Sequence, residues 1–417
     1  MEKITGKINA TPNPVCFGEG CVVISWETND PSGSEIRVAT PAHKEKVVVE
    51  GGKAGRVEIH WIQNSTEYEF RLYAASRLHK SIDSVKVKGN SNSLHPLLTE
   101  AALEVKRGNI GVAALSDFIA KVLPSCVHNS KFREIFRLWE RHGFHVTPVH
   151  FYQPIPNTQS LPETLWNQAS ELVGIDMNDP MQLDLLRNHF PKFRGEYDQF
   201  SAEPTDSPVR FHLNNGLFDG TDALVAYCMI RHFQPRLIIE VGSGFSSLVA
   251  AEAIAKNKGS ALICIEPFPM DFLRKGVLGL HSLIEKKVED VDLEFFSQLC
   301  SGDILFIDSS HTVRIGGDVN YLFLEVLPRL KAGVIVHVHD IFFPFDYRRD
   351  WVMDELRFWA EQYLLQAFLT FNSQFEVLMA NAYLGHRHME DLKRTFANSP
   401  WWGGGSFWMR RRAAKAD

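Results

Sequence analysis

One eleven-residue stretch, Leu237–Ser247 (LIIEVGSGFSS), constrains the fold of this chain more than any other. Its apolar run ends at an acid, Glu240, and a glycine-rich turn follows at Gly242–Gly244. The next residues, Leu248–Ala255, have the composition of a helix. Glycines let the backbone N–H groups at a helix start approach a ligand closely, because they carry no Cβ. The stretch therefore predicts a strand, a tight turn and a helix, with a ligand site at the turn.

From Phe211 onward, strand candidates alternate with helix candidates, which predicts a parallel sheet. The strand candidates are Arg236–Val241, Ala261–Glu266, His281–Glu285, Asp303–Asp308, Gly333–His339, Phe375–Ala380 and Ser406–Arg410. Helices are expected after most of them, including Val319–Leu330 and Trp351–Phe368. Between the last two strands, His386 and His388 are expected at the polar surface.

Four of these strands end in polar side chains, although their interiors are mostly apolar. The strand-end residues are Glu240, Glu266, Asp308 and the pair His339 and Asp340. Ligands of open α/β sheets bind beyond the carboxyl ends of the strands. We therefore expect these side chains to surround one site.

The glycine turn resembles the S-adenosylmethionine (SAM) site of class I methyltransferases, in which an ExGxG turn is followed by a strand-end acid. Here Glu240, Gly242 and Gly244 form the turn and Glu266 is the second acid. The resemblance implies a Rossmann-like seven-stranded sheet, mostly parallel, with an antiparallel last strand. It also implies that SAM contacts these four residues and Ser243.

Further cofactor contacts are implied by the same resemblance. Asn215 and Asp219 stand in a loop that would close over SAM, Glu289 and Asp290 would lie near adenine, and Asp308 is also counted as a contact. Simpler interpretations stay open: an ordinary Asn-Gly turn at the first position, and capping of a helix by Asp290.

The segments DILFIDSSH and AGVIVHVHD resemble metal-dependent O-methyltransferases of the catechol type. The resemblance implies that Asp308, His339 and Asp340 hold a divalent metal (Mg, Mn or Fe). It also implies that Asp308 and His311 are catalytic, with His311 as the general base. His339 departs from the oxygen ligand of that family, and imidazole favours Mn, Fe or Zn over Mg.

This chemistry is physically coherent for a hydroxyl acceptor. A divalent cation lowers the pKa of a bound hydroxyl, a neutral histidine accepts the proton, and positioning supplies much of the remaining acceleration. Structural interpretations remain open, with His311 as a capping residue and His339 as a core histidine. His337 lies on the same strand face as His339 and could compete as a ligand.

Residues 1–89 are predicted to form an all-β sandwich, because short alternating runs are separated by turn clusters. The runs are Cys21–Trp26, Glu35–Val38, Lys46–Val49, Arg56–Ile59, Tyr68–Tyr73 and Ser84–Val87. The stretch from Trp61 to Leu72 resembles the late strands of fibronectin type III domains. That resemblance places Tyr68 at the tyrosine corner, and Trp26 would fill the core.

Three domains are therefore expected: the sandwich at 1–89, a mainly helical connecting or lid region at 97–205, and a class I methyltransferase domain at 206–417. A polar linker, Gly89–Ser93, would join the first two. In the connecting region, Lys131–Arg141 and Pro180–Phe190 are predicted helices. The segment at 145–156 is interpreted either as a lid or as a packed connector.

Composition narrows the functional classes. The net charge of −6 gives no electrostatic reason to expect nucleic acid or a membrane surface as a partner. No apolar run of membrane-spanning length and no leader pattern is seen, which predicts a soluble, cytoplasmic protein. None of the six cysteines forms a CxxC pair, so they are expected to be reduced core residues.

The sequence thus predicts a SAM-dependent methyltransferase that acts on a hydroxyl of a sugar or secondary metabolite. The expected partner is a small-molecule or glycan acceptor, and assembly into a homo-oligomer is left open. An NAD-dependent oxidoreductase would need a third glycine where Ser247 stands. The sequence also leaves open a hydroxylase-like enzyme that uses His311, His339 and Asp340, and a non-catalytic binding protein.

Overall fold

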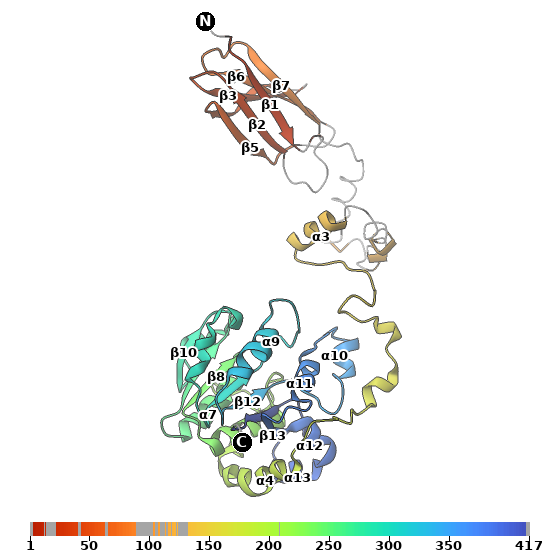
Figure 1. The fold of residues 1–417 in the computed structure, drawn as a ribbon, viewed down its shortest axis with the longest axis vertical. Coiled ribbons are helices and arrows are strands. Elements are labelled where there is room, and N and C mark those ends of the chain that lie inside the picture. The colour runs from red at the N-terminus through yellow and green to blue at the C-terminus, as the bar shows by residue number, and fades with distance from the viewer. Residues whose placement is uncertain are drawn as a thin grey trace. The chain divides into compact units, whose positions relative to one another are not determined.

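The computed structural model describes residues 3–11, 13, 22–40, 43–62, 66–88, 132–207 and 209–413, with scattered residues between 103 and 123. The chain divides into two compact units, Met1–Pro148 and Val149–Asp417 (Figure 1). The boundary falls inside the predicted connecting region 97–205. Its later part belongs to the second unit, because Leu186, Phe190 and Tyr197 are buried in the same core as the large sheet.

The first unit contains two antiparallel sheets. Its strands are β1 (Gly6–Thr11), β2 (Val22–Thr28), β3 (Ser34–Thr40), β4 (His43–Gly51), β5 (Ala54–Ile59), β6 (Glu67–Ala74) and β7 (Ser81–Lys88). The sheet orders are β1-β2-β5 and β4-β3-β6-β7. Val22, Ile24 and Trp26 alternate into the core, as expected for Trp26. Strand β1 was not predicted, because only Ile8 and Ala10 in GKINAT are apolar.

Helix α3 (Phe132–Arg141) follows in the first unit and agrees with the helix predicted at Lys131–Arg141. None of its residues is buried. The predicted linker Gly89–Ser93 lies outside the described residues, as do Cys16, Cys21 and Cys126. Cys228 and Cys264 are buried and unpaired as expected, whereas Cys300 is exposed.

The second unit is built on one seven-stranded sheet. Its strands are β8 (Leu237–Val241), β9 (Ala261–Ile265), β10 (Leu280–Ile284), β11 (Ile304–Ile307), β12 (Ile335–Val338), β13 (Phe375–Ala380) and β14 (Phe407–Arg411). Their order is β10-β9-β8-β11-β12-β14-β13. The first five are parallel, and β14 runs antiparallel to β12 and β13. All seven predicted strands are present, and the antiparallel last strand is confirmed.

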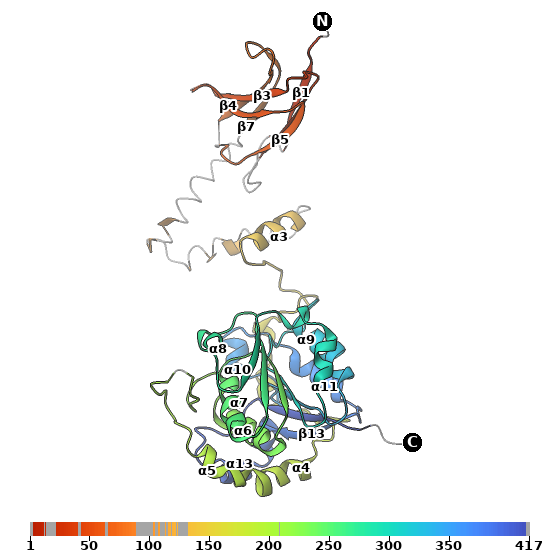
Figure 2. The same cartoon turned by 90° about the vertical axis from the view of Figure 1, so that its left-hand side faces the viewer.

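Helices cover both faces of this sheet, which is why its strands are apolar on both sides. Consecutive residues on β8, Ile238 and Ile239, enter two different cores. The first core includes α6 (Gly220–Phe233), α7 (Phe245–Lys256), α12 (Asn381–Arg387) and α13 (Met389–Thr395). The second includes α9 (Asp318–Tyr321), η7 (Leu322–Val326) and α11 (Glu361–Leu369). Figure 2 shows α6 and α7 on one side and α9 and α11 on the other.

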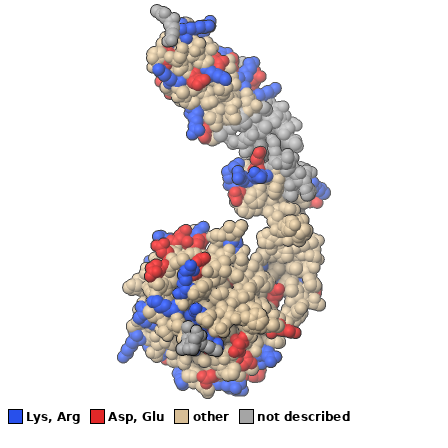
Figure 3. All heavy atoms as spheres, viewed as in Figure 1, with Lys and Arg blue, Asp and Glu red and all other residues tan. Residues whose placement is uncertain are grey.

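The shorter helices lie around this framework. They are α4 (Asp179–Asp184), α5 (Arg194–Tyr197), α8 (Asp271–Lys275) and α10 (Arg349–Met353). The helix predicted at Pro180–Phe190 begins as α4 and continues through a π-helical turn, Leu185–His189. No helix in the described part of the chain is long and apolar enough to cross a membrane. Figure 3 shows basic and acidic side chains interspersed over the visible face of the second unit.

The helix predicted at Trp351–Phe368 is broken into α10 and α11. Residues 354–360 between them are not helical, and Leu356 has a φ of +58°. The N–H groups of Ala360 and Glu361 donate to the carbonyl of His311, so a tertiary contact replaces helical hydrogen bonds here. The apolar pattern alone gave no signal for this break, since the segment contains neither glycine nor proline.

Candidate active site

A cavity of about 1040 Å³ opens at the carboxyl ends of the parallel strands. Predicted site residues that line it are Asp219, Gly242, Ser243, Gly244, Glu266, Asp308, His339 and Asp340. An aromatic wall completes the cavity, formed by Phe342, Phe345, Trp351, Trp359, Trp401 and Trp402. The strand-end residues are thus brought together, as the sheet topology predicts.

The glycine turn forms one wall of the cavity. Gly242 has a φ of +77°, and a Cβ added to it would lie 1.7 Å from the carbonyl oxygen of Asp308. Only glycine permits this approach of the turn after β8 to the end of β11. By contrast, a Cβ on Gly244 would meet nothing within 4 Å. The requirement for glycine is therefore strict at the first position of the turn and weak at the second.

Ser247, which stands where a dinucleotide pattern has its third glycine, ties the turn to Glu240. The Ser247 hydroxyl accepts from the N–H of Gly244 at 3.1 Å and donates to Glu240 Oε2 at 2.6 Å. Glu240 is only 1% exposed and does not line the cavity. Burial raises the pKa of its carboxyl group to about 7. The structure therefore places Glu240 beneath the turn, where it supports the wall from below.

Glu266 follows β9 and lines the cavity beside the turn. Its Oε2 accepts from the N–H of Ser243 at 3.2 Å, and its Oε1 accepts from the N–H of Phe268 at 2.8 Å. An ionised carboxylate has about four acceptor positions, so both oxygens can accept further hydrogen bonds. The side chain is fixed in place and still able to accept from the hydroxyls of a ligand.

Three predicted cofactor contacts lie away from the cavity lining. Asn215 shapes its own turn: its Oδ1 accepts from the N–H of Phe218 at 2.8 Å, and its Nδ2 donates to the carbonyl of His212 at 2.9 Å. Glu289 and Asp290 lie in a 3-10 helix, η5 (Val288–Asp290), which Asp290 ends rather than caps. Residues 149–156, the part of the predicted lid segment that lies in the second unit, also contribute nothing to the lining.

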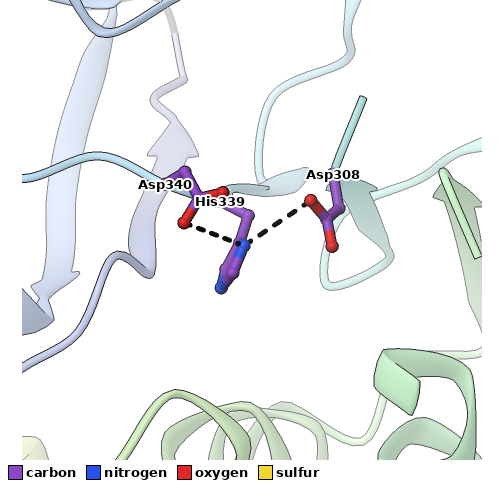
Figure 4. A group of neighbouring side chains, drawn as sticks. All are labelled: Asp308, His339 and Asp340. Carbon is purple, nitrogen blue, oxygen red and sulfur yellow. Dashed lines mark ion pairs between the residues drawn. The ribbon is translucent and has the colours of Figure 1, made fainter. Parts of the chain in front are cut away.

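Asp308, His339 and Asp340 form a compact group that could hold a metal ion (Figure 4). One ligand atom from each lies within 4.8 Å of the others. His339 Nδ1 is 3.5 Å from Asp308 Oδ1 and 3.5 Å from Asp340 Oδ1. These residues follow the adjacent parallel strands β11 and β12, which explains why they meet. Two carboxylates and one imidazole are a donor set that suits Mn²⁺, Fe²⁺ or Zn²⁺.

His311 lies behind this group and is buried. Its Nδ1 is 2.8 Å from Glu361 Oε2, and its Nε2 is 3.4 Å from Asp308 Oδ1 and 3.4 Å from Asp340 Oδ2. Burial by itself lowers the pKa of His311, but the contacts with Asp308 and Glu361 outweigh it and raise the pKa to about 10. The backbone φ of +57° is unusual for a histidine and marks a constrained position.

Charge also sets the pKa of the neighbouring groups. Burial would raise the pKa of Asp308, but the two histidines beside it hold that pKa well below its usual range. Burial lowers the pKa of His339, and the charges of Asp340 and Asp308 reverse this and raise it well above the usual value. Both shifts reflect one arrangement, in which carboxylates and imidazoles neutralise each other out of water.

His337 does not join this group. It is fully buried, stacks on Phe306 at a centroid distance of 3.8 Å, and its Nε2 lies 3.0 Å from the hydroxyl of Ser406. Burial lowers the pKa of His337 well below its usual value, which keeps the ring neutral. The expected competition between His337 and His339 for a metal is therefore not supported.

Several cavity residues were missed by sequence reasoning. Asp222 on α6 and Trp359 line the cavity, and Glu361 at the start of α11 contacts His311 behind it. None of the three carried a prediction, because only the fold brings them to the strand ends. Trp401 and Trp402 stand in a segment to which no function was attributed, and His386, expected at the polar surface, also lines the cavity. For these missed residues, the sequence offered one signal: two tryptophans, Trp401 and Trp402, directly before three glycines.

Comparison with known proteins gives the class. Residues 239–341 match a protein family described as "Methyltransferase domain". Among solved structures, an O-methyltransferase from Streptomyces achromogenes in complex with SAM is 14% identical, with a TM-score of 0.31, covering 57% of this chain and 92% of that one. An O-methyltransferase from Bacillus cereus in complex with SAH is 12% identical, with a TM-score of 0.28, covering 55% and 91%.

The family match identifies a methyltransferase domain in the second unit, and the strand order of its sheet agrees with the class I type that the sequence predicts. A relative from Archaeoglobus fulgidus, an uncharacterized protein, is 38% identical over 165 residues, which are 36% of this chain and 72% of the relative. The chain belongs to the same family as that protein.

Proposed function

We propose that the protein transfers a methyl group from SAM to a hydroxyl of a sugar or secondary metabolite, with the help of a divalent cation. One observation carries the proposal: the glycine turn with Glu266 and the group of Asp308, His339 and Asp340 line the same cavity. A cofactor wall and a cation wall that face one space are what cation-assisted methyl transfer requires.

The glycine turn and Glu266 would hold SAM. The turn presents backbone N–H groups at the start of α7, and Glu266 offers acceptors for the two ribose hydroxyls. Asp219 also lines the cavity, where its carboxylate accepts a hydrogen bond from the indole N–H of Trp401 at 3.1 Å. These residues fix the position of the ligand, and in-line positioning is most of what a reactive sulfonium methyl group needs.

Asp308, His339 and Asp340 would hold the cation. When bound, a divalent cation lowers the pKa of the acceptor hydroxyl by several units. His311 would take the proton on Nε2, while its Nδ1–H donates to Glu361. The pKa of about 10 for His311 results from the neighbouring carboxylates, with no cation bound to them. A cation held by Asp308, His339 and Asp340 would lower the pKa of His311 and favour the neutral imidazole that a base requires.

The aromatic wall supports a ring-shaped acceptor. Trp351 and Trp359 lie 5.3 Å apart with an interplanar angle of 75°, and Arg357 lies 4.8 Å and 5.0 Å from their ring centroids. Aromatic rings and the flat faces of sugars both pack on such surfaces. The cavity is at the upper end of the range for ligand sites, which leaves room for a cofactor and a small acceptor.

The test is transfer of radiolabelled methyl groups from SAM to a panel of sugars, catechols and other hydroxyl compounds, with and without EDTA. We expect labelled product with at least one acceptor and its loss in EDTA. His311→Ala should abolish turnover and leave SAM affinity within a few-fold. Equal loss of turnover and SAM affinity would contradict the role of His311 as a base.

A second candidate rests on the position of Asp340 between two histidines. Asp340 Oδ2 is 3.4 Å from His311 Nε2, and its Oδ1 is 3.5 Å from His339 Nδ1. Two histidines and one carboxylate are the ligands of many Fe(II) oxygenases. A hydroxylase-like enzyme would consume oxygen with Fe²⁺ and produce no methylated acceptor, so the same assay separates the two candidates.

A further inference from the structure

The two ring nitrogens of His339 face different surroundings. Nδ1 is directed at the carboxylates of Asp308 and Asp340, each 3.5 Å away. Nε2 is buried and makes no hydrogen bond, and it lies 3.7 Å from Asp222 Oδ2. The ring therefore separates the proposed cation site on one side from a single carboxylate on the other.

Asp222 is held firmly on that other side. It lies in the first turn of α6 and is 4% exposed. Its Oδ1 accepts from Asn381 Nδ2 and the N–H of Ser406, both at 2.8 Å, and its Oδ2 accepts from the N–H of Gly405 at 2.9 Å. Oδ2 retains an acceptor position for His339, because a carboxylate oxygen can accept two hydrogen bonds.

Two glycines before β14 make room for the carboxylate of Asp222. Gly404 has a φ of +107°, and a Cβ added there would lie 2.3 Å from Asp222 Oδ2. A Cβ added to Gly405 would lie 2.8 Å from the Cα of Asp340. The glycine segment before β14 thus allows three side chains to lie side by side in space: Asp222 on α6, then His339, then Asp340 at the cation site.

We propose that Asp222 is a positioning residue for His339. An acceptor at Nε2 places the ring proton there and leaves the lone pair of Nδ1 directed toward Asp308 and Asp340. Carboxylates that orient metal-binding histidines in this way contribute about 10–100-fold to metal affinity. The inference rests on the proposed cation site and adds a consequence: the site is built for a cation that accepts nitrogen ligands, such as Mn²⁺, Fe²⁺, Co²⁺ or Zn²⁺, in preference to Mg²⁺.

A purely structural role must be separated from this one, because Asp222 also binds the backbone before β14. Asp303 offers a matched control. It is 1% exposed, accepts from the N–H groups of Leu237 at 2.8 Å and Cys300 at 2.9 Å, and stands before β11, at the opposite end of that strand from Asp308. Asp303→Asn removes a similarly buried, backbone-bonded carboxylate without contact with a histidine.

The experiment measures binding of Co²⁺ and Mg²⁺ to the full chain after treatment with a chelator, by calorimetry and by the visible spectrum of Co²⁺. We expect the wild type to bind Co²⁺ more tightly than Mg²⁺. Asp222→Asn should weaken Co²⁺ binding about 10–100-fold, and Asp303→Asn should change it by less than about twofold. A folded Asp222→Asn variant with the Co²⁺ affinity of the wild type would overturn the proposal.

If Asp222→Asn does not fold, the His339→Asp variant tests the proposal instead. This variant removes the nitrogen ligand and the need for an oriented ring, so the preference for Co²⁺ over Mg²⁺ should fall at least tenfold. An unchanged preference would overturn the proposal. SAM affinity measured on the same samples separates the two proposals. Absence of Co²⁺ binding with intact SAM binding overturns this inference and the cation site on which it rests, and leaves SAM-dependent methyl transfer standing. Absence of SAM binding overturns the proposed methyltransferase function.

Discussion

The two walls of the cavity are built in opposite ways. The glycine turn of the cofactor wall is local: the turn and the side chains that support it, from Glu240 to Ser247, lie within one short stretch of chain, and Glu266 is added from the next strand. The cation wall is made of side chains from distant segments, and the contact between His311 and Glu361 spans 50 residues. The first wall depends on one steric requirement at Gly242, and the second depends on a balance of buried charges. They should therefore respond differently to substitution.

The largest effect is expected at Asp308, which touches both histidines of the cation wall. Asp308→Asn removes a charge from a group that must neutralise His311, His339 and a bound cation. We expect turnover to fall by about 1000-fold, while SAM affinity changes only a few-fold. Steady-state kinetics and calorimetry measure the two quantities. Asp271→Asn, on the exposed start of α8, is the control and should leave both unchanged.

The cofactor wall should fail by a different route, through loss of structure. Gly242→Ala forces a Cβ onto the carbonyl of Asp308 in a backbone conformation that favours glycine. We expect a loss of about 3 kcal/mol in unfolding free energy, together with loss of SAM binding. Gly244→Ala meets open space and should be close to neutral in denaturant unfolding. Equal destabilisation by both substitutions would mean that the close approach at Gly242 is not what shapes the turn.

Glu240 has a buried carboxyl group beneath the glycine turn, and we expect ionisation of that group to destabilise the fold. Its pKa is raised from 4.5 to about 7, so the folded protein binds this proton more tightly than the unfolded chain does. Stability therefore falls as the pH rises from about 4.5 to about 7, and stays lower above that range. Glu240→Gln cannot ionise and should gain about 3 kcal/mol over the wild type at pH 8, with little difference at pH 4. Urea unfolding at pH 4 and pH 8 measures the free energy of unfolding of both proteins. The same difference between variant and wild type at both pH values would contradict the prediction.

The smallest effect is expected at Glu361, which acts on the acceptor through His311. Glu361→Gln removes the charge that helps to raise the pKa of His311. Turnover should fall about tenfold, and the limb of the rate profile that rises with pH should move to lower pH. A merely structural role would lower the rate without moving the profile. Glu325→Gln, on the exposed side of η7, provides the control.

The contrast between the walls also explains how much the sequence could predict. The strands, the glycine turn and the strand-end residues Glu266, Asp308, His339 and Asp340 follow from local pattern and from one rule of sheet topology. Their placement in one cavity agrees with that prediction. Sequence spacing does not tell a side chain beneath a turn from one above it, so it could not show that Glu240 is buried under the glycine turn or that Asn215 hydrogen-bonds within its own turn.

What the sequence could not predict depends on contacts between distant segments. Asp222 and Glu361 reach the histidines only because α6 and α11 pack on opposite faces of the sheet. Trp359 reaches the cavity because the N–H groups of Ala360 and Glu361 bind the carbonyl of His311, which interrupts an otherwise helical pattern. A single sequence does not show where tertiary hydrogen bonds will override a local preference for helix.

The most direct measurement is calorimetric titration of the full chain with SAM and, separately, with NAD, for the wild type and Glu266→Ala. We predict micromolar binding of SAM, clear weakening of that binding by Glu266→Ala, and no binding of NAD. Binding of NAD, or the absence of SAM binding in both the presence and the absence of Mn²⁺, would contradict the proposal that the glycine turn and Glu266 form a SAM site.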